Sequence, residues 1–293
     1  MAEGRIVKAL SGFYYVQTED QVYPCKGRGV FRKRNITPLV GDFVSFDLDS
    51  NQEGYITEIK PRHNELVRPP IANIDQAMIV SSAAMPNFSS TLLDRFLVLI
   101  EAKGIQPIIF ITKMDMATEE EKAALQAYKQ SYEQLGYHVE LFSSKEPAQP
   151  ERIAALFTNK VTVIAGQSGV GKSSLLNALK PSLLLKTADI SKSLGRGKHT
   201  TRHVELIEVN GGLVADTPGF SALDFEGLEA EELGGCFPEI RERTGMCKFR
   251  GCLHVKEPQC AIKAGVASQE IPSFRYEHYV DFLAEIQSRK PRY

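Results

Sequence analysis

The sequence predicts a multi-domain chain with three parts: a small β-barrel of the OB-fold type, a central α/β domain and a C-terminal, mostly α-helical segment that binds a metal. Three observations support this prediction. Residues 1–68 contain short strand-like runs, residues 69–222 alternate apolar strands with amphipathic helices, and residues 223–293 are polar and carry clustered Cys and His. A chain of 293 residues is long enough for more than one core.

The N-terminal part is rich in Val, Ile, Phe and Tyr. Its runs read "RIVKAL", "GFYYVQT", "QVYPCKG", "DFVSFDL" and "GYITEIKP", and Gly, Asn and Asp turn residues separate them. Five short strands in about sixty residues are typical of an OB-fold barrel. "RPP" at 68–70 marks the expected boundary.

The central part alternates strand and helix patterns. "QAMIVSS", "PIIFIT", "HVELFSS", "VTVIAG" and "GGLVADT" are predicted strands, while "TLLDRFLVLIEAKG" and residues 118–135 are predicted helices. Near-continuous apolar strands favour a parallel sheet covered on both faces. In the last part, Tyr279, Phe282, Leu283 and Ile286 share one face of a predicted helix.

Composition restricts the function classes. The chain has 35 basic and 36 acidic residues, so any nucleic-acid binding must come from local patches. No run approaches the roughly 18 to 20 apolar residues that span a bilayer, and the N-terminus lacks the apolar run of a signal peptide. An odd count of five cysteines favours a reducing compartment. We expect a cytoplasmic monomer that does not contact membranes.

A phosphate-binding loop follows the strand "VTVIAG". Gly166, Gly171, Lys172 and Ser173 fit G-x-x-x-x-G-K-[ST] between a strand and a helix, the context that this motif requires. Backbone N–H groups would surround the β-phosphate, the catalytic Lys172 would reach the β- and γ-phosphates, and the Ser173 hydroxyl would ligate Mg²⁺. The predicted contacts are Gly166, Gln167, Ser168, Gly169, Val170, Gly171, Lys172, Ser173 and Ser174. By itself this loop leaves an ATP-using kinase or ATPase open.

Guanine selectivity is predicted from Thr112, Lys113, Met114 and Asp115, which follow a strand. The Asp115 carboxylate offers two acceptors to guanine's two adjacent donors, whereas adenine would leave it unpaired. The Lys113 stem can lie along the base. Many GTPases have Asn in place of Thr112. The loop that supports the base is predicted at Ser143, Ser144 and Lys145.

"DTPG" supplies the next expected contacts. Asp216 would hold Mg²⁺ through water, and the Gly219 N–H would meet the γ-phosphate. In "SKSLGRGKHTTRHVEL", Thr200 or Thr201 is the expected switch ligand of Mg²⁺, and Thr201 is preferred.

The residue after Gly219 cannot orient water. Many GTPases place Gln there, but this chain has Phe220, which neither donates nor accepts a hydrogen bond. His199 is the nearest residue that could position the attacking water. Alternatively, His199 contacts a binding partner and has no catalytic role.

The order of these motifs is inverted, because the base-reading motif precedes the phosphate loop. Cutting an ordinary GTPase domain before its base-reading strand and joining its former ends gives this order, with the join at 145–160. Domain termini that lie close together tolerate such a circular permutation.

Three cysteines and one histidine lie within fourteen residues: Cys247, Cys252, His254 and Cys260. Three thiolates and an imidazole predict one closed, tetrahedral, structural Zn²⁺ site. Cys25 and Cys236 are isolated in sequence, and we expect them to pack as small apolar residues.

Over essentially the whole chain, this layout resembles the small-subunit (30S) biogenesis family of circularly permuted bacterial GTPases. "GQSGVGKSSL", "GRGKHTTRH", "DTPGF" and C-x₄-C-x-H-x₅-C carry the resemblance. It implies an OB-fold, a permuted GTPase domain and a zinc domain. It also implies that the protein hydrolyses GTP to GDP, and that it binds the small ribosomal subunit, which stimulates hydrolysis during late maturation.

A basic run in the barrel is the predicted RNA-binding patch. It comprises Lys26, Arg28, Phe31, Arg32, Lys33 and Arg34. Cations around an aromatic ring suit RNA, although a solvated basic loop has the same composition, and the resemblance favours ribosomal RNA. Besides the ATP-using enzyme, an RNA-binding module in which the nucleotide only stabilises the fold remains an alternative.

Overall fold

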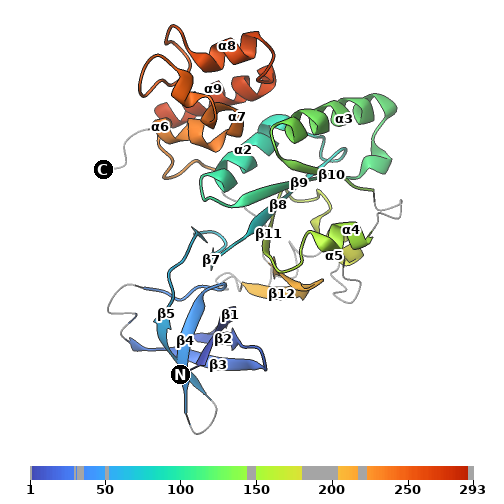
Figure 1. Ribbon diagram of the computed structural model, residues 1–293. Helices are drawn as coiled ribbons and strands as arrows, with labels where there is room; N and C mark the ends of the chain where they lie inside the picture. The colour runs from blue at the N-terminus through green and yellow to red at the C-terminus, as the bar shows by residue number, and fades with distance from the viewer. Residues whose placement is uncertain are drawn as a thin grey trace. The chain divides into compact units, whose positions relative to one another are not determined.

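The computed structural model describes residues 2–29, 31, 36–49, 53–143, 150–179, 204–216 and 223–289 (Figure 1). Several predicted site residues lie outside this set: Arg32, Lys33, Arg34, Ser144, Lys145, His199, Thr200, Thr201, Gly219 and Phe220. The chain divides into two compact units. The first comprises Met1–Met78 and Ser143–Ser221, and the second comprises Ile79–Phe142 and Ala222–Tyr293.

The first unit begins with a closed barrel. Its strands are β1 (Ala2–Leu10), β2 (Phe13–Gln17), β3 (Val22–Gly27), β4 (Phe43–Leu48) and β5 (Gly54–Ile59). The ladder runs β1-β2-β3-β5-β4, and a β1–β4 pairing closes it, with Ala2 opposite Phe46. All of these pairs are antiparallel except β3–β5. The predicted OB-type barrel is confirmed.

Alternation along the barrel strands builds the barrel core. Ile6, Val16, Cys25, Phe46 and Ile56 are fully buried, as the period of two along a strand requires. A Cβ at Gly54 would lie 2.2 Å from the Cys25 sulfur, so this position excludes a side chain. Burial raises the pKa of the Cys25 thiol to about 11. Cys25 is therefore an apolar core residue, as predicted.

A hydrogen-bonded connection follows the barrel and contains the small ladder of β6 (Glu65–Leu66) and β7 (Ile71–Ala72). Arg62 donates to both oxygens of the buried Asp42, with Nε–Oδ1 2.7 Å and Nη2–Oδ2 2.8 Å. Asn64 exchanges two hydrogen bonds of 2.8 Å with the backbone of Ile74. This connection fixes its own backbone within the first unit.

The α/β part of the first unit has three strands and two short helices among the described residues. Parallel β11 (Val161–Ala165) and β13 (Gly212–Asp216) lie side by side, and β12 (Glu205–Val209) pairs antiparallel with β13. Asn210 and Gly211 both have positive φ, which suits the tight turn of this hairpin. The helices are α4 (Pro150–Ala155) and α5 (Lys172–Leu179).

The second unit begins within β8 (Gln76–Ser82). β9 (Gln106–Thr112) lies beside β8, and β10 (His138–Leu141) pairs parallel with β9. Helices α2 (Ser90–Glu101) and α3 (Glu119–Gln134) alternate with these strands. The Ser89 hydroxyl caps α2, and Thr118 and Glu121 form a capping box on α3. The predicted alternation of strand and helix is confirmed.

The C-terminal part is helical, as predicted. It contains α6 (Ala230–Leu233), η3 (Gly234–Cys236), α7 (Pro238–Arg241), η4 (Thr244–Met246), α8 (Ala261–Ala267) and α9 (Ser273–Gln287). The predicted face of α9 is buried, and its residues pack with Phe225, Phe237 and Cys236. Cys236 is thus an apolar core residue. Among the described residues, no helix combines the length and apolarity needed to cross a lipid bilayer.

Candidate nucleotide and metal sites

The phosphate loop lies in the first unit, between β11 and α5. β11 is buried along its whole length, so the loop emerges from a rigid core strand. Gly166, Gly169 and Gly171 have φ of 140°, 82° and 95°, values that favour glycine. Successive backbone N–H groups in such a turn form an anion-binding concavity at a helix N-terminus. The sequence-predicted loop therefore has the backbone that its role requires.

Lys172 is held over this loop. Its Nζ donates to the carbonyl oxygens of Gly166 at 2.7 Å and Gln167 at 2.6 Å. Burial lowers the pKa of Lys172, so neutral carbonyls alone leave this ammonium poorly compensated. A bound phosphate would supply the missing negative charge. Ser173 and Ser174 follow in the first turn of α5, and Asp216 ends β13 in the same unit.

The base-reading turn lies in the second unit, after β9. Lys113 is left-handed, with φ 59° and ψ 33°, and a 3₁₀ turn over Met114–Met116 carries Asp115. The N–H of Met114 donates to the Phe142 carbonyl at 3.3 Å, so the end of β10 supports the turn. Asp115 is half-buried. Ser143, which follows Phe142, is buried.

Thr112 has a structural contact that the sequence did not reveal. It is buried, and its hydroxyl donates to the Ser81 carbonyl at 3.1 Å. Its own carbonyl accepts from the N–H of Ala83 at 2.8 Å. Thr112 thus fastens the end of β8 to the base-reading turn.

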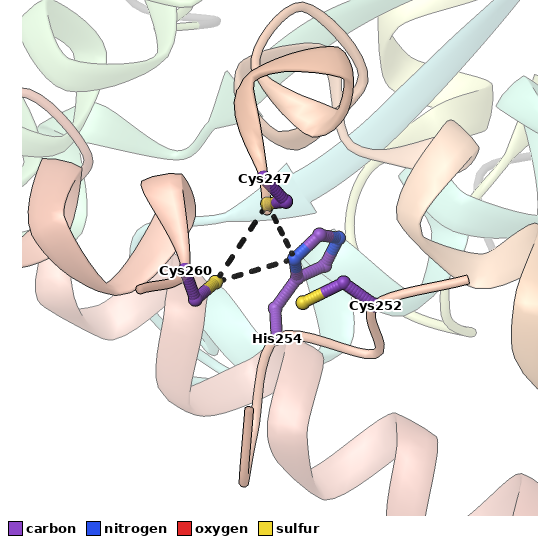
Figure 2. Close-up of side chains that lie close together, drawn as sticks. All are labelled: Cys247, Cys252, His254 and Cys260. Atoms are coloured by element: carbon purple, nitrogen blue, oxygen red, sulfur yellow. Dashed lines mark hydrogen bonds between the residues drawn. The ribbon is translucent and has the colours of Figure 1, made fainter. Parts of the chain in front are cut away.

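The predicted metal ligands converge, as Figure 2 shows. Nδ1 of His254 lies 3.5 Å from the Cys247 sulfur and 3.4 Å from the Cys260 sulfur, and those two sulfurs are 3.9 Å apart. All four ligand atoms, including Sγ of Cys252, lie within 4.8 Å of one another. The four residues can therefore bind a metal ion.

The three distances among Cys247, Cys260 and His254 fit a tetrahedral ion. A Zn–S bond of about 2.3 Å and a Zn–N bond of about 2.0 Å give tetrahedron edges of about 3.8 Å between sulfurs and about 3.5 Å between sulfur and nitrogen. The distances for Cys247, Cys260 and His254 match these edges within about 0.1 Å. Burial raises the pKa of the Cys252 thiol to about 12. A dication would reverse this preference for the protonated thiol.

Neighbouring groups orient the metal ligands. His254 has φ 62°, and its carbonyl accepts from the Tyr276 hydroxyl at 2.7 Å. The Tyr279 hydroxyl donates to the Leu253 carbonyl at 2.9 Å, and Glu257 accepts from the Leu253 N–H at 2.9 Å. Helix α9 thus supports the loop that carries the predicted metal ligands.

The structure describes three residues of the predicted RNA patch: Lys26, Arg28 and Phe31. Lys26 pairs with Glu53 at 2.8 Å and Arg28 with Asp47 at 3.1 Å, so nearby carboxylates offset both cations. Phe31 is 8% exposed and belongs to the barrel core. This burial does not favour the predicted stacking of Phe31 on bases, because little of its ring is accessible.

Two family models match the chain: the RsgA N-terminal domain over residues 3–56 and the RsgA GTPase over residues 59–226. The chain belongs to the RsgA GTPase family. It is a GTP hydrolase, and the motifs that predicted this activity lie in the matched region. An RsgA-family GTPase uses Mg²⁺ with its nucleotide. The alternatives, an ATP-using enzyme and a non-catalytic RNA-binding module, are therefore wrong.

Full-length relatives support this membership. The chain is 64% identical to "Small ribosomal subunit biogenesis GTPase RsgA 2" of Oceanobacillus iheyensis and 59% identical to "Small ribosomal subunit biogenesis GTPase RsgA" of Bacillus subtilis (strain 168), with all of each chain covered. Among solved structures, the chain is similar to YloQ, which is described as a circularly permuted GTPase. The TM-score is 0.86 and the sequence identity is 55%, with 100% of this chain and 97% of the YloQ chain covered. YjeQ from Thermotoga maritima matches at 0.87 and 35% identity over 98% and 99%. The permuted order of this RsgA-family GTPase is confirmed.

Proposed function

We propose that this GTPase binds the small (30S) ribosomal subunit and hydrolyses GTP during the subunit's late maturation. The observation that carries this proposal is the full-length identity of 59–64% to relatives named for small-subunit biogenesis. The match spans every part of the chain, so the flanking parts come with the GTPase domain. We assign residues 1–68 to an RNA-binding barrel, 69–222 to the permuted GTPase domain and 223–293 to the zinc domain.

The nucleotide contacts follow from chemistry. Asp115 reads the guanine edge, and the Lys113 stem covers the base, with Thr112 and Met114 holding the turn. Ser143, Ser144 and Lys145 support the base, and the loop Gly166–Ser174 surrounds the phosphates. Lys172 stabilises the charge that develops on the γ-phosphate. Ser173, Thr201 and Asp216 would hold Mg²⁺, which would neutralise negative charge on the phosphates.

The attacking water needs a hydrogen-bond partner to orient it, and the Phe220 side chain cannot be that partner. We assign its orientation to His199, whose neutral imidazole accepts a proton from water. The Gly219 N–H meets the γ-phosphate. A subunit that docks on the parts flanking these segments would position His199, so hydrolysis is slow in the free protein and faster on the subunit.

The Cys₃His site holds one structural Zn²⁺. Three thiolates favour zinc over magnesium or calcium, and a closed set of four ligands has no position for a reacting water. In the barrel, Lys26 and Arg28 together with Arg32, Lys33 and Arg34 contact ribosomal RNA through its phosphates. The protein acts in the cytoplasm as a monomer.

Nucleotide-dependent subunit binding tests this proposal. The protein is mixed with purified small subunits in a non-hydrolysable GTP analogue or in GDP, and the bound fraction is measured after sedimentation. If the γ-phosphate orders the switch segments that the subunit contacts, the protein should bind small subunits more tightly with the GTP analogue than with GDP. Large subunits are the control and should not bind in either state. Equal affinity for small and large subunits would rule the proposal out.

A further inference from the structure

The segment between β8 and α2, residues 83–89, carries a side chain that none of the nucleotide motifs explains. Met85 is 67% exposed, although it is a large apolar residue. Its φ is +45°, in the left-handed region that costs a long side chain energy. A strained backbone conformation of this kind persists only where surrounding contacts stabilise it, and such conformations are most frequent at active sites and ligand-binding sites.

Hydrogen bonds fix this segment against the base-reading turn. Thr112 makes two hydrogen bonds here: its hydroxyl donates to the Ser81 carbonyl near the end of β8, and its carbonyl accepts from the N–H of Ala83, the first residue of the segment. The hydroxyl of Ser82, the last residue of β8, donates to the Pro86 carbonyl of the segment at 2.5 Å. The backbone that carries Met85 is therefore held beside Thr112.

Lys113 links Met85 to the base-reading residue. Its Nζ donates to the Met85 carbonyl. Met85 thus lies at the ammonium end of the Lys113 stem, and Asp115 follows two residues from its backbone end. Asp115 would hold the guanine edge opposite the bond to the sugar. The ammonium end of a stem that lies along the base then points toward the sugar.

We propose that Met85 is a nucleotide-binding residue whose side chain covers the sugar side of the guanosine held by Lys113 and Asp115. This inference rests on the proposed role of Asp115. A flexible, polarisable thioether suits contact with sugar C–H groups and a purine face. The contact is apolar and remote from the γ-phosphate, so it contributes equally to GTP and GDP binding and does not distinguish one base from another.

Affinity measurements on Met85→Ala test the contact. We expect the affinities for GTP and GDP to fall by the same factor, about fivefold. Nucleotide binding would bury roughly half of the apolar side chain in the wild type, and the alanine variant loses this burial. Met85→Leu, which restores an apolar side chain of similar size, should restore most of the affinity. Met246→Ala, which removes another exposed methionine, is the matched control and should bind as the wild type does.

Asp115→Asn separates this inference from the proposed site. That variant should prefer xanthine over guanine nucleotides, and adding Met85→Ala should weaken xanthine nucleotide binding by the same factor as it weakens guanine nucleotide binding in the wild type. Unchanged base preference in Asp115→Asn would refute the site. If Asp115→Asn shifts the base preference to xanthine as expected, but Met85→Ala binds GTP and GDP with wild-type affinity, only the role of Met85 is refuted.

Oxidation of the wild-type protein gives a second readout that needs no variant. Peroxide converts exposed methionine to the sulfoxide. Saturating GDP should slow this reaction at Met85 at least severalfold and leave Met246 unchanged, as peptide mass spectrometry would measure. Equal oxidation of Met85 with and without GDP would overturn the proposal.

Discussion

Nη1 of Arg275 lies 2.5 Å from Oδ1 of Asp94, and neither side chain is exposed to solvent. Glu239 accepts from Nε of the same guanidinium at 2.7 Å. Nδ1 of His278 lies 2.6 Å from the second Asp94 oxygen, and the Tyr132 hydroxyl donates to Asp94 at 2.7 Å. Burial opposes the charge of Arg275, but Asp94 and Glu239 more than offset it and hold the pKa of Arg275 above its usual range. This network joins α9, α7, α2 and α3 within one unit.

Arg275→Met should strongly destabilise the protein. It leaves Asp94 and Glu239 buried without their cation, which typically costs about 3–5 kcal/mol. Urea denaturation measures the loss. Arg243→Met is the matched control: Arg243 pairs with the exposed Glu270 at 3.0 Å, and such a pair contributes about 0–1 kcal/mol. Similar losses in both variants would show that the buried network has no special role.

The carboxylate of Glu285 gives a pH dependence. Arg95 donates to it twice, at 2.9 Å and 2.5 Å, and these bonds lower the pKa of Glu285 in the folded protein. Because the pKa of Glu285 is lower in the folded protein than in the unfolded chain, its ionised form stabilises the folded state. This stabilisation is present at pH values above the pKa of the unfolded chain, and it is lost as the pH falls through the pKa of the folded protein. Glu285→Gln should therefore reduce the free energy of unfolding at pH 7, and the difference from wild type should shrink below about pH 4. A difference that stays constant down to pH 3 would contradict this.

Metal removal should unfold the ligand loop without abolishing nucleotide binding. We expect about one Zn²⁺ per chain, lost in Cys252→Ser. Because Tyr276 and Tyr279 donate to this loop and the chain has no Trp, tyrosine fluorescence reports the change. Cys236→Ala removes a buried cysteine outside the site and should keep the zinc. Protein purified without chelators and found free of zinc would rule this assignment out.

Lys172→Ala or Ser173→Ala should abolish GTP hydrolysis while the zinc content stays at the wild-type level. Lys172 places its ammonium over the loop carbonyls, and alanine removes this charge. Lys103→Ala removes an exposed lysine and should hydrolyse GTP normally. The measurement is phosphate release at saturating GTP. Normal turnover in either loop variant would remove the phosphate-loop assignment.

Features that are local in sequence were predictable. The phosphate loop and the Cys₃His cluster are short, and their spacing alone implies their geometry. The motif order predicted the permutation, because order is read directly from the chain. The OB barrel followed from alternation and turn residues.

Features that depend on distant partners were not predictable. Arg275 meets Asp94 and Glu239 from 181 and 36 residues away, and its only sequence signal was a cation four residues before Tyr279, on the buried face of the helix. Composition could not show whether Phe31 faces RNA or the barrel core. Met85 stands out only through its backbone conformation and its bond to Lys113.

We propose above that a small ribosomal subunit completes the hydrolysis machinery of this GTPase. The most direct test is the rate of GTP turnover with and without purified small subunits, for the wild type and His199→Ala. The free protein should turn over well below about 1 per second, because Phe220 cannot orient water, and subunits should raise this rate strongly. His199→Ala should keep its GTP affinity and lose the stimulated rate. A wild-type rate that subunits leave unchanged would contradict the account.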